Sequence, residues 1–328
     1  MLSYRKLAMR VLGRPLHTGG SDSPRPASQR AAALILTAAM LTTLAAPAFA
    51  KEWYIEDGDI TVKASGTEGT NKVSQGANQE VEDTDTIITN RNEGTASSNT
   101  VTINAGNDKV EVTLKDVNID TSSRNEAAMS VTGSGNTTIK LDGDNHLTGG
   151  NGIYSNSSGS LTISGGETDS LTAQGGDSRN GIYSVSGDVT ISGGTVTATG
   201  GNSTGSYGSG GDGIHSGSLT ISGGTVTANG GSGSYRGGSG IHSRSDIDLS
   251  GSLELTAKAG SPNGKALSQK GSELDLDTIK DKLGPGAKVT ATDANGETKQ
   301  VSIPRPVEPE GPVIPEESSS SSDSGSST

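Results

Sequence analysis

The sequence contains no cysteine, and its 328 residues include one tryptophan and one phenylalanine. Without cysteine, neither a disulfide framework nor a thiolate metal site can form. With so few large rings, any core must be filled by aliphatic side chains. The 49 glycines alone would suit a disordered chain, but the aliphatic residues recur at regular positions, which disorder gives no reason to maintain. We therefore expect stability to come from repetition.

Positive charge is also scarce. When residues 1–50 are set aside, the 25 basic residues fall to 19 and the 37 acidic residues to 36, which leaves a net charge of −17. A chain with this charge repels the phosphates of nucleic acid, so we expect no nucleic-acid partner. The same charge is compatible with neutral glycans and with cations, of which calcium is the one to consider.

Residues 1–50 have the features of a secretory signal peptide. Basic residues precede an apolar stretch at 31–46, which is shorter than the roughly 20 residues of a membrane span. Small residues at Ala48 and Ala50 predict cleavage before Lys51. A membrane anchor is the alternative, but threonines dilute the apolar stretch. The sequence therefore predicts a secreted, extracellular or envelope-associated protein with no membrane span in the mature chain.

One unit recurs four times, beginning at Asn151, Asn180, Asp212 and Ser239. Its second residue is always glycine, and these glycines are spaced 27 to 32 residues apart, including variable loops. A weaker copy precedes the four and another follows them. Periods of this size indicate a stacked array.

Each unit holds three short segments in which apolar and polar residues alternate, separated by glycine or serine turns. Such alternation is typical of β-strands with one buried face. Stacked units would superpose equivalent side chains about 4.8 Å apart, as ladders in a narrow core. The sequence therefore predicts an all-β fold, a parallel β-helix (solenoid) with three short strands per coil, about six to seven coils and capped ends. The predicted inward ladders are Ile153, Ile182, Ile214 and Ile241 in the first strand; Leu161, Val189, Leu219 and Ile247 with Ile163, Ile191, Ile221 and Leu249 in the second; and Leu171, Val196, Val226 and Leu255 with Ala173, Ala198, Ala228 and Ala257 in the third.

The repeat also divides the mature chain. Residues 51–124 contain strand-like pieces with degraded spacing, which we interpret as an N-terminal cap and the first irregular coils. Residues 125–276 are the regular coils. Residues 304–328 are rich in proline, glutamate and serine, a composition that predicts a disordered linker.

Residues 277–303 predict a C-terminal cap. Asp277 is the expected N-cap of a short helix that runs to Leu283. A hairpin that turns at Asn295-Gly296 should follow and cover the open end of the core.

The outward positions of the strands argue against catalysis. Hydrolases and lyases built on β-helices need carboxylates or bases on adjacent strands, and here those positions carry mainly threonine and serine. Asp188, Asp246 and Asp248 fall in or beside the second segment, but Asp188 and Asp246 lie at turn edges without a matching partner in the neighbouring unit. We therefore interpret these residues as surface acids. We predict that the protein is not an enzyme, and a polysaccharide lyase or hydrolase is the least favoured function.

The residue after each inward isoleucine of the first strand should form a surface column, which consists of Tyr154, Tyr183, His215 and His242. Such rings could form a platform for the apolar faces of sugars, with polar tips free for hydrogen bonds. They could equally stack on one another and shield the backbone. The two histidines could share a metal ion, but the sequence indicates no third ligand beside them.

Two long loops, 202–211 and 231–239, carry Tyr207 and Tyr235 on the same corner of successive coils. Flexible loops with a central tyrosine are typical of adaptable binding surfaces. They could also be insertions that the solenoid tolerates at its corners.

Oxygen-bearing residues gather at several turns, and a hard cation such as calcium prefers oxygen ligands. For Asn151 and Asn180 we expect a different role, hydrogen bonding to the turn backbone. The predicted calcium ligands are Asp142, Asp144, Asn145, Asp177 and Asp212.

The strings GIYS, GIHS, LTISGG and TVTATGG, preceded by TVTINAG and TTIKLDGDNHLTGG, resemble the carbohydrate-binding-domain family of secreted bacterial β-helix proteins. The likeness spans roughly residues 97–260. It implies a right-handed β-helix, bound calcium, and attachment to a polysaccharide such as cellulose or pectin without hydrolysis. The leading prediction is thus a non-catalytic polysaccharide-binding or adhesion protein whose partner is a polysaccharide or cell-surface glycan. The alternative is a structural stalk of a surface adhesin with a protein partner.

Overall fold

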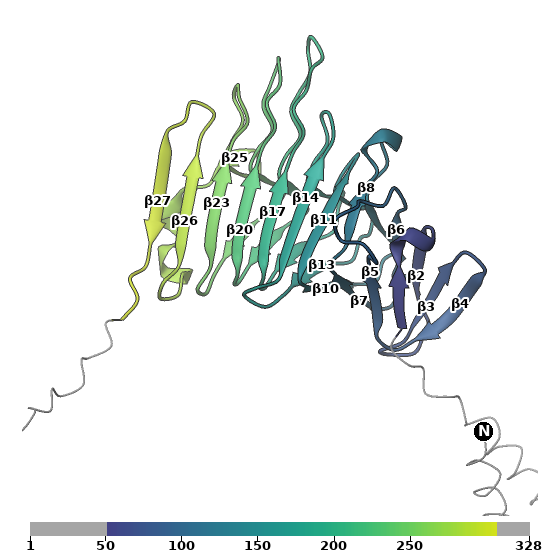
Figure 1. The fold of residues 1–328 in the computed structure, drawn as a ribbon. Coiled ribbons are helices and arrows are strands. Elements are labelled where there is room, and N and C mark those ends of the chain that lie inside the picture. The colour runs from purple at the N-terminus through teal and green to yellow at the C-terminus, as the bar shows by residue number, and fades with distance from the viewer. Residues whose placement is uncertain (1–50, 307–328) are drawn as a thin grey trace, which may run out of the picture. The chain divides into compact units, whose positions relative to one another are not determined.

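The computed structural model describes residues 51–306. These residues form a parallel β-helix of about seven turns, bounded by three sheets that we call A, B and C (Figure 1). In the regular region each turn contributes one strand to sheet B, then one to sheet A and one to sheet C. The expected signal peptide, residues 1–50, and residues 307–328 of the expected linker lie outside the described residues.

Sheet A has eight strands, and every neighbouring pair is parallel. Leu161 is in register with Val189, and Ile163 with Ile191, so the ladders predicted for the second strand are superposed. In spatial order the strands are β1 (Lys51–Tyr54), β5 (Thr86–Thr89), β7 (Val110–Lys115), β10 (Thr137–Asp142), β13 (Leu161–Ser164), β16 (Val189–Ile191), β19 (Leu219–Ile221) and β22 (Ile247–Leu249).

Sheet B has eleven strands, and it carries the first strand of each unit. Ile182 is in register with Ile153 on one side and with Ile214 on the other. The strands are parallel from β2 to β24, and antiparallel strands extend the sheet at both ends. In spatial order they are β4 (Asn78–Asp83), β3 (Asn71–Gln75), β2 (Ile60–Ala64), β6 (Val101–Asn104), β9 (Met129–Thr132), β12 (Ile153–Ser155), β15 (Ile182–Ser184), β18 (Ile214–Ser216), β21 (Ile241–Ser243), β24 (Leu267–Gln269) and β25 (Ser272–Glu273).

Sheet C has eight strands, of which seven are parallel and the last, β27, is antiparallel. Ala198 is in register with Ala173 and with Ala228, as predicted for the third strand. In spatial order the strands are β8 (Asn118–Asp120), β11 (Asp144–Gly149), β14 (Ser170–Gly175), β17 (Thr195–Thr199), β20 (Thr225–Asn229), β23 (Glu254–Lys258), β26 (Lys288–Thr292) and β27 (Thr298–Ser302).

The core lies between the three sheets and is almost entirely aliphatic. All residues of the predicted ladders are buried, and none is more than 4% exposed. Among residues 51–306, Trp53 of β1 is the one large ring in this core, and its indole nitrogen donates a hydrogen bond of 2.8 Å to the carboxylate of Asp83. The indole can be buried at the N-terminal end because its polar atom is satisfied there.

The glycine at the second position of each unit is required by close packing between coils. A Cβ added to Gly181 would lie 2.6 Å from the backbone nitrogen of Thr199 and 2.7 Å from the carbonyl oxygen of Ala173. Real side chains do not approach backbone this closely, so any other residue would push the coils apart. The corner between sheets C and B therefore needs glycine at this position.

The N-terminal region departs from the simple repeat. A short 3₁₀-helix, η1 (Ile55–Asp57), follows β1, and a second, η2 (Ser122–Arg124), follows β8. Strands β2, β3 and β4 form antiparallel hairpins that add two strands to sheet B beyond the parallel coils, as Figure 1 shows. The sequence pattern did not predict β3 and β4.

At the other end, the expected hairpin is present as β26 and β27. The expected helix is a 3₁₀-helix, η3 (Leu276–Lys282), and its N-cap is Asp275 instead of Asp277. The Asp275 carboxylate accepts a hydrogen bond of 3.0 Å from the backbone nitrogen of Asp277. The prediction of Asp277 as the cap was wrong because Leu276 is buried and belongs to the first turn of the helix. Within residues 51–306, no helix has the length and apolar character that crossing a membrane requires.

Candidate functional site

The four rings predicted to form a surface column do so, and we call them the aromatic column: Tyr154, Tyr183, His215 and His242. Each is the second residue of its strand in sheet B, in β12, β15, β18 and β21 respectively. Consecutive members are in register along the sheet. Because neighbouring residues on both sides point into the core, these side chains must point outward. All four are half-buried by their neighbours.

The rings of the aromatic column contact one another in three different ways. Tyr154 and Tyr183 have centroids 5.7 Å apart and planes tilted by 51°. Tyr183 meets His215 edge to face at 5.0 Å. His215 and His242 are stacked at 4.5 Å with planes within 2° of parallel. The column therefore has a tilted tyrosine half, whose ring faces are not fully covered by each other, and a closed histidine half.

A pocket of about 510 Å³ opens beside the tyrosine half. Its volume is in the range of small-ligand sites, and most of its lining is polar. Arg179 and Glu126 supply opposite charges, and Tyr154 and Tyr183 form one wall. The lining residues are Thr100, Thr102, Asn125, Glu126, Ala127, Ser130, Gly150, Asn151, Tyr154, Arg179 and Tyr183.

The turns that precede the column are joined by a series of side-chain hydrogen bonds, which we call the Asx ladder: Asn151, Asn180 and Asp212. The side-chain oxygen of Asn151 accepts from the backbone nitrogen of Asn180 at 2.9 Å, and that of Asn180 accepts from the nitrogen of Asp212 at 2.6 Å. Asp212 Oδ1 accepts in turn from the nitrogen of Ser239 at 2.6 Å. The turn-stabilising role predicted for the two asparagines is confirmed, and Asp212 shares it.

The second carboxylate oxygen of Asp212 faces the histidine half of the column. Its Oδ2 atom lies 2.8 Å from Nδ1 of His215 and 4.0 Å from Nδ1 of His242. Burial lowers the pKa of the His242 imidazole; the Asp212 carboxylate opposes this shift, while the cationic forms of His215, Arg236 and Arg244 reinforce it. Within residues 51–306, Asp212, His215 and His242 are the one group of three titratable donors close enough to share a metal ion.

The sequence reasoning found the two histidines but missed their third partner. The turn position of Asp212 predicts a calcium ligand, whereas in the structure its carboxylate faces the two imidazoles. The signal was present in the string Asp212-Gly-Ile-His215, since a turn residue three positions before an outward strand residue can fold back over it.

The other predicted calcium ligands lie at two corners of the coil. Asp142 ends β10 and Asp144 begins β11, between sheets A and C, whereas Asp177 follows β14 between sheets C and B. Asn145 is fully buried, and its Oδ1 accepts from the backbone nitrogen of Val117 at 3.0 Å. Its amide nitrogen donates to three backbone carbonyls, so this side chain serves the turn.

The predicted loop tyrosines are the most exposed large hydrophobic residues in the described part of the chain, with Tyr207 at 88% and Tyr235 at 67%. The two loops lie beside each other, because Ser209 and Arg236 form a parallel bridge. Tyr235 and Arg236 line a second pocket of about 420 Å³ together with His242. Thus the structure brings one of the two loop tyrosines to the end of the aromatic column.

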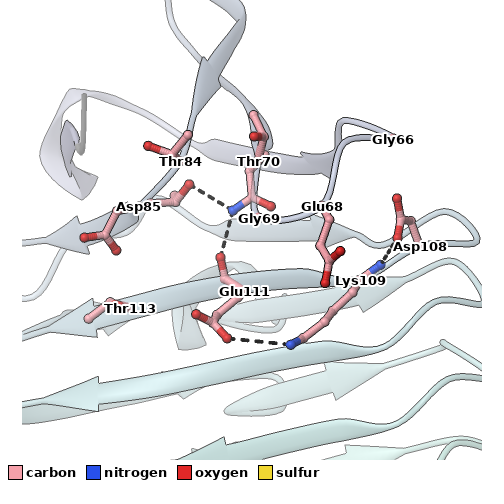
Figure 2. A pocket seen from close by; sticks show the side chains of 12 residues that line it. Gly66, Glu68, Gly69, Thr70, Thr84, Asp85, Asp108, Lys109, Glu111 and Thr113 are labelled. Atoms are coloured by element: carbon pink, nitrogen blue, oxygen red, sulfur yellow. Dashed lines mark hydrogen bonds and ion pairs between the residues drawn. The ribbon is translucent and has the colours of Figure 1, made fainter. Parts of the chain in front are cut away.

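A further pocket, of about 460 Å³, lies in the N-terminal region, where the β2–β3 turn meets β5 and β7 (Figure 2). Figure 2 shows the Lys109 ammonium group directed toward the carboxylate of Glu111, 3.9 Å away, with Glu68 nearby. The sequence reasoning did not identify this pocket, because its acids come from separate, irregular segments. No aromatic side chain lines it, so it lacks the ring face that the column offers to a sugar.

Comparisons of this chain with models of protein families, with curated proteins and with solved structures find no match. The likeness to the carbohydrate-binding family therefore remains an expectation drawn from sequence motifs. The structure by itself establishes a parallel β-solenoid with three sheets and an outward column of rings.

Proposed function

We propose that this chain is a secreted, non-catalytic polysaccharide-binding protein that holds its ligand on the tyrosine half of the aromatic column. The observation that carries the proposal is the position of Tyr154 and Tyr183, tilted at 5.7 Å beside a polar pocket of about 510 Å³. A sugar ring has apolar C–H faces and a polar rim. It would lie against the tyrosines while its hydroxyls reach the polar lining.

The charge of the protein favours a neutral glycan. The mature chain carries a net charge of −17, so an anionic polysaccharide meets long-range repulsion that a neutral glucan does not. Within the pocket, Arg179 presents donors to hydroxyl groups, and Glu126 presents an acceptor although one of its oxygens pairs with Arg124. We therefore propose cellulose-like neutral polysaccharide as the preferred ligand class, with pectin weaker.

The test is a binding assay with the full chain, microcrystalline cellulose and an array of soluble neutral and acidic polysaccharides. Replacing both tyrosines, Tyr154→Ala with Tyr183→Ala, should weaken binding by roughly fivefold to a hundredfold, since each ring contributes about 0.5 to 1.5 kcal/mol. The matched control is Tyr207→Ala with Tyr235→Ala, which removes two exposed rings from the loops. Equal binding by wild type and the column variant, or loss of binding in the loop variant alone, would contradict the proposal.

A structural stalk is the second candidate, and the continuous ladders favour it. Three sheets run along the coils and both ends of sheet B close with antiparallel strands, which suits a rod that separates other parts of a cell surface. A stalk predicts no binding to any polysaccharide on the array. An enzymatic function as a lyase or hydrolase is the least favoured candidate. Release of reducing or unsaturated ends from pectin or cellulose would support it.

A further inference from the structure

We infer that Asp212, His215 and His242 form a binding site for a divalent metal ion of the zinc class, and that the ion joins two adjacent coils. Asp212 lies on the turn before β18, His215 lies within β18, and His242 lies in the next coil on β21. The inference does not depend on glycan binding, because it concerns the histidine half of the aromatic column.

The donor atoms are already gathered. Asp212 Oδ2 is 2.8 Å from His215 Nδ1 and 4.0 Å from His242 Nδ1, and one donor from each residue lies within 4.8 Å of the others. Bonds of about 2.0 to 2.2 Å in a tetrahedron separate zinc ligands by about 3.3 Å. The carboxylate would move slightly away from His215 and toward His242. The ring of His242 would tilt about χ2, a torsion with broad freedom in histidine.

The surroundings hold these donors in place. Asp212 Oδ1 is occupied by the backbone nitrogen of Ser239 at 2.6 Å, which leaves Oδ2 directed at the imidazoles. Tyr183 packs edge to face against His215 and limits its rotation. Such outer contacts are what orient the ligands of established metal sites.

The donor set selects the class of metal. Two imidazole nitrogens and one carboxylate oxygen suit zinc, cobalt, nickel or copper, whereas calcium requires six to eight oxygen ligands. Three protein ligands also leave a fourth position for water or another ligand. The sequence predicts Asp212 as a calcium ligand, but the imidazoles of His215 and His242 beside it favour zinc or a similar transition metal.

Two cationic side chains beside the site provide a further test. Arg236 lines a pocket together with His242, and Arg244 follows His242 by two residues. Their repulsion should weaken metal binding, because like charges at this range are only partly screened. Arg236→Ala should therefore bind the metal several-fold more tightly than the wild type. Arg244 is less suitable for substitution, since its guanidinium donates to the carbonyl of Val185.

The primary experiment is calorimetric titration of Zn²⁺ into the full, untagged chain after treatment with a chelator, with Co²⁺ absorption as a second readout. We expect one ion per chain and the visible bands of tetrahedral Co²⁺. His242→Gln and Asp212→Asn should each weaken binding at least tenfold. His146→Gln is the matched control, because His146 is an exposed histidine on β11 of sheet C, and it should leave binding unchanged.

The Asp212→Asn variant separates loss of metal binding from loss of folding. Asparagine occupies the equivalent positions 151 and 180 and makes the same hydrogen bond to the next coil. Zinc should raise the melting temperature of the wild type by several degrees and leave that of Asp212→Asn unchanged. Unchanged zinc affinity in His242→Gln, or Ca²⁺ binding that outcompetes Zn²⁺ at this site, would overturn the inference. A wild-type chain that binds zinc but no cellulose or other polysaccharide would refute only the proposed function.

Discussion

The two halves of the aromatic column have the same backbone conformation and differ in the chemistry of their side chains. In the tyrosine half, the turn residue three positions before the ring is asparagine, at Asn151 and Asn180; in the coil of His215 it is aspartate. All three turn residues accept a hydrogen bond from the next coil. The extra carboxylate oxygen of Asp212 then faces an imidazole, whereas an amide would offer that ring no charge. The same repeated backbone therefore presents two tyrosine rings in one half of the column, and two imidazoles beside a carboxylate in the other.

If the two halves of the aromatic column have the same backbone conformation, the glycine at the second position of each unit should contribute equally to the stability of both. Gly181→Ala and Gly213→Ala should each destabilise the protein by about 3 kcal/mol or more, at the upper end of overpacking costs, since an added Cβ meets backbone atoms of neighbouring strands. The clash distances begin at 2.6 Å in both cases. Urea unfolding followed by circular dichroism measures the effect.

Gly205→Ala is the control for this prediction, because a Cβ there would meet nothing closer than 3.9 Å. It should change stability by less than about 0.5 kcal/mol. A tolerated alanine at either 181 or 213 would show that the coils are not packed as closely as described.

The buried ladder beneath the column should show the next largest effect. Ile182→Ala and Ile214→Ala should each cost about 2 to 4 kcal/mol, because both side chains are fully buried and the coil cannot collapse around the cavity. The same unfolding measurement applies. A loss below about 1 kcal/mol in one half alone would break the equivalence of the two coils.

Substitutions in the Asx ladder should cause the smallest loss of stability, and they test how asparagine and aspartate differ between the two halves of the column. Measured with a chelator present, Asn180→Ala and Asp212→Ala should each cost about 1 to 2 kcal/mol, because each leaves a part-buried backbone N–H of the next coil without its acceptor. Asp212→Asn keeps an acceptor and should cost under about 0.5 kcal/mol. An Asp212→Asn loss as large as that of Asp212→Ala would mean that the carboxylate charge, and not the turn hydrogen bond, stabilises the corner.

Much of the fold could be predicted because each position of the unit recurs in several copies, and every copy shows the same inward or outward pattern. Ile153, Ile182 and Ile214 recur with outward neighbours, so the inward ladder followed from alternation and glycine spacing alone. Single-copy features were predicted less well. The strands β3 and β4 have no second copy with which to compare them, and Asp275 replaced Asp277 as the cap because burial of Leu276 depends on the rest of the core.

The candidate site was predicted only in part. Stacking of identical units placed Tyr154, Tyr183, His215 and His242 in one column, which the register confirms. The pocket beside Tyr154 depends on Thr100, which lies in the irregular N-terminal region, and on Glu126, which immediately precedes the weaker copy of the unit. The repeat does not specify the side chains at either position.

The sequence by itself determined the coil: alternation decides which side chains are buried, and glycine decides where the chain can turn between closely packed strands. Tertiary structure alone decided the distances between side chains that project from different coils. The approach of Asp212 to two histidines and the tilt between the two tyrosines depend on turn geometry and on rotamers, which follow from packing in three dimensions and leave no periodic trace in the chain.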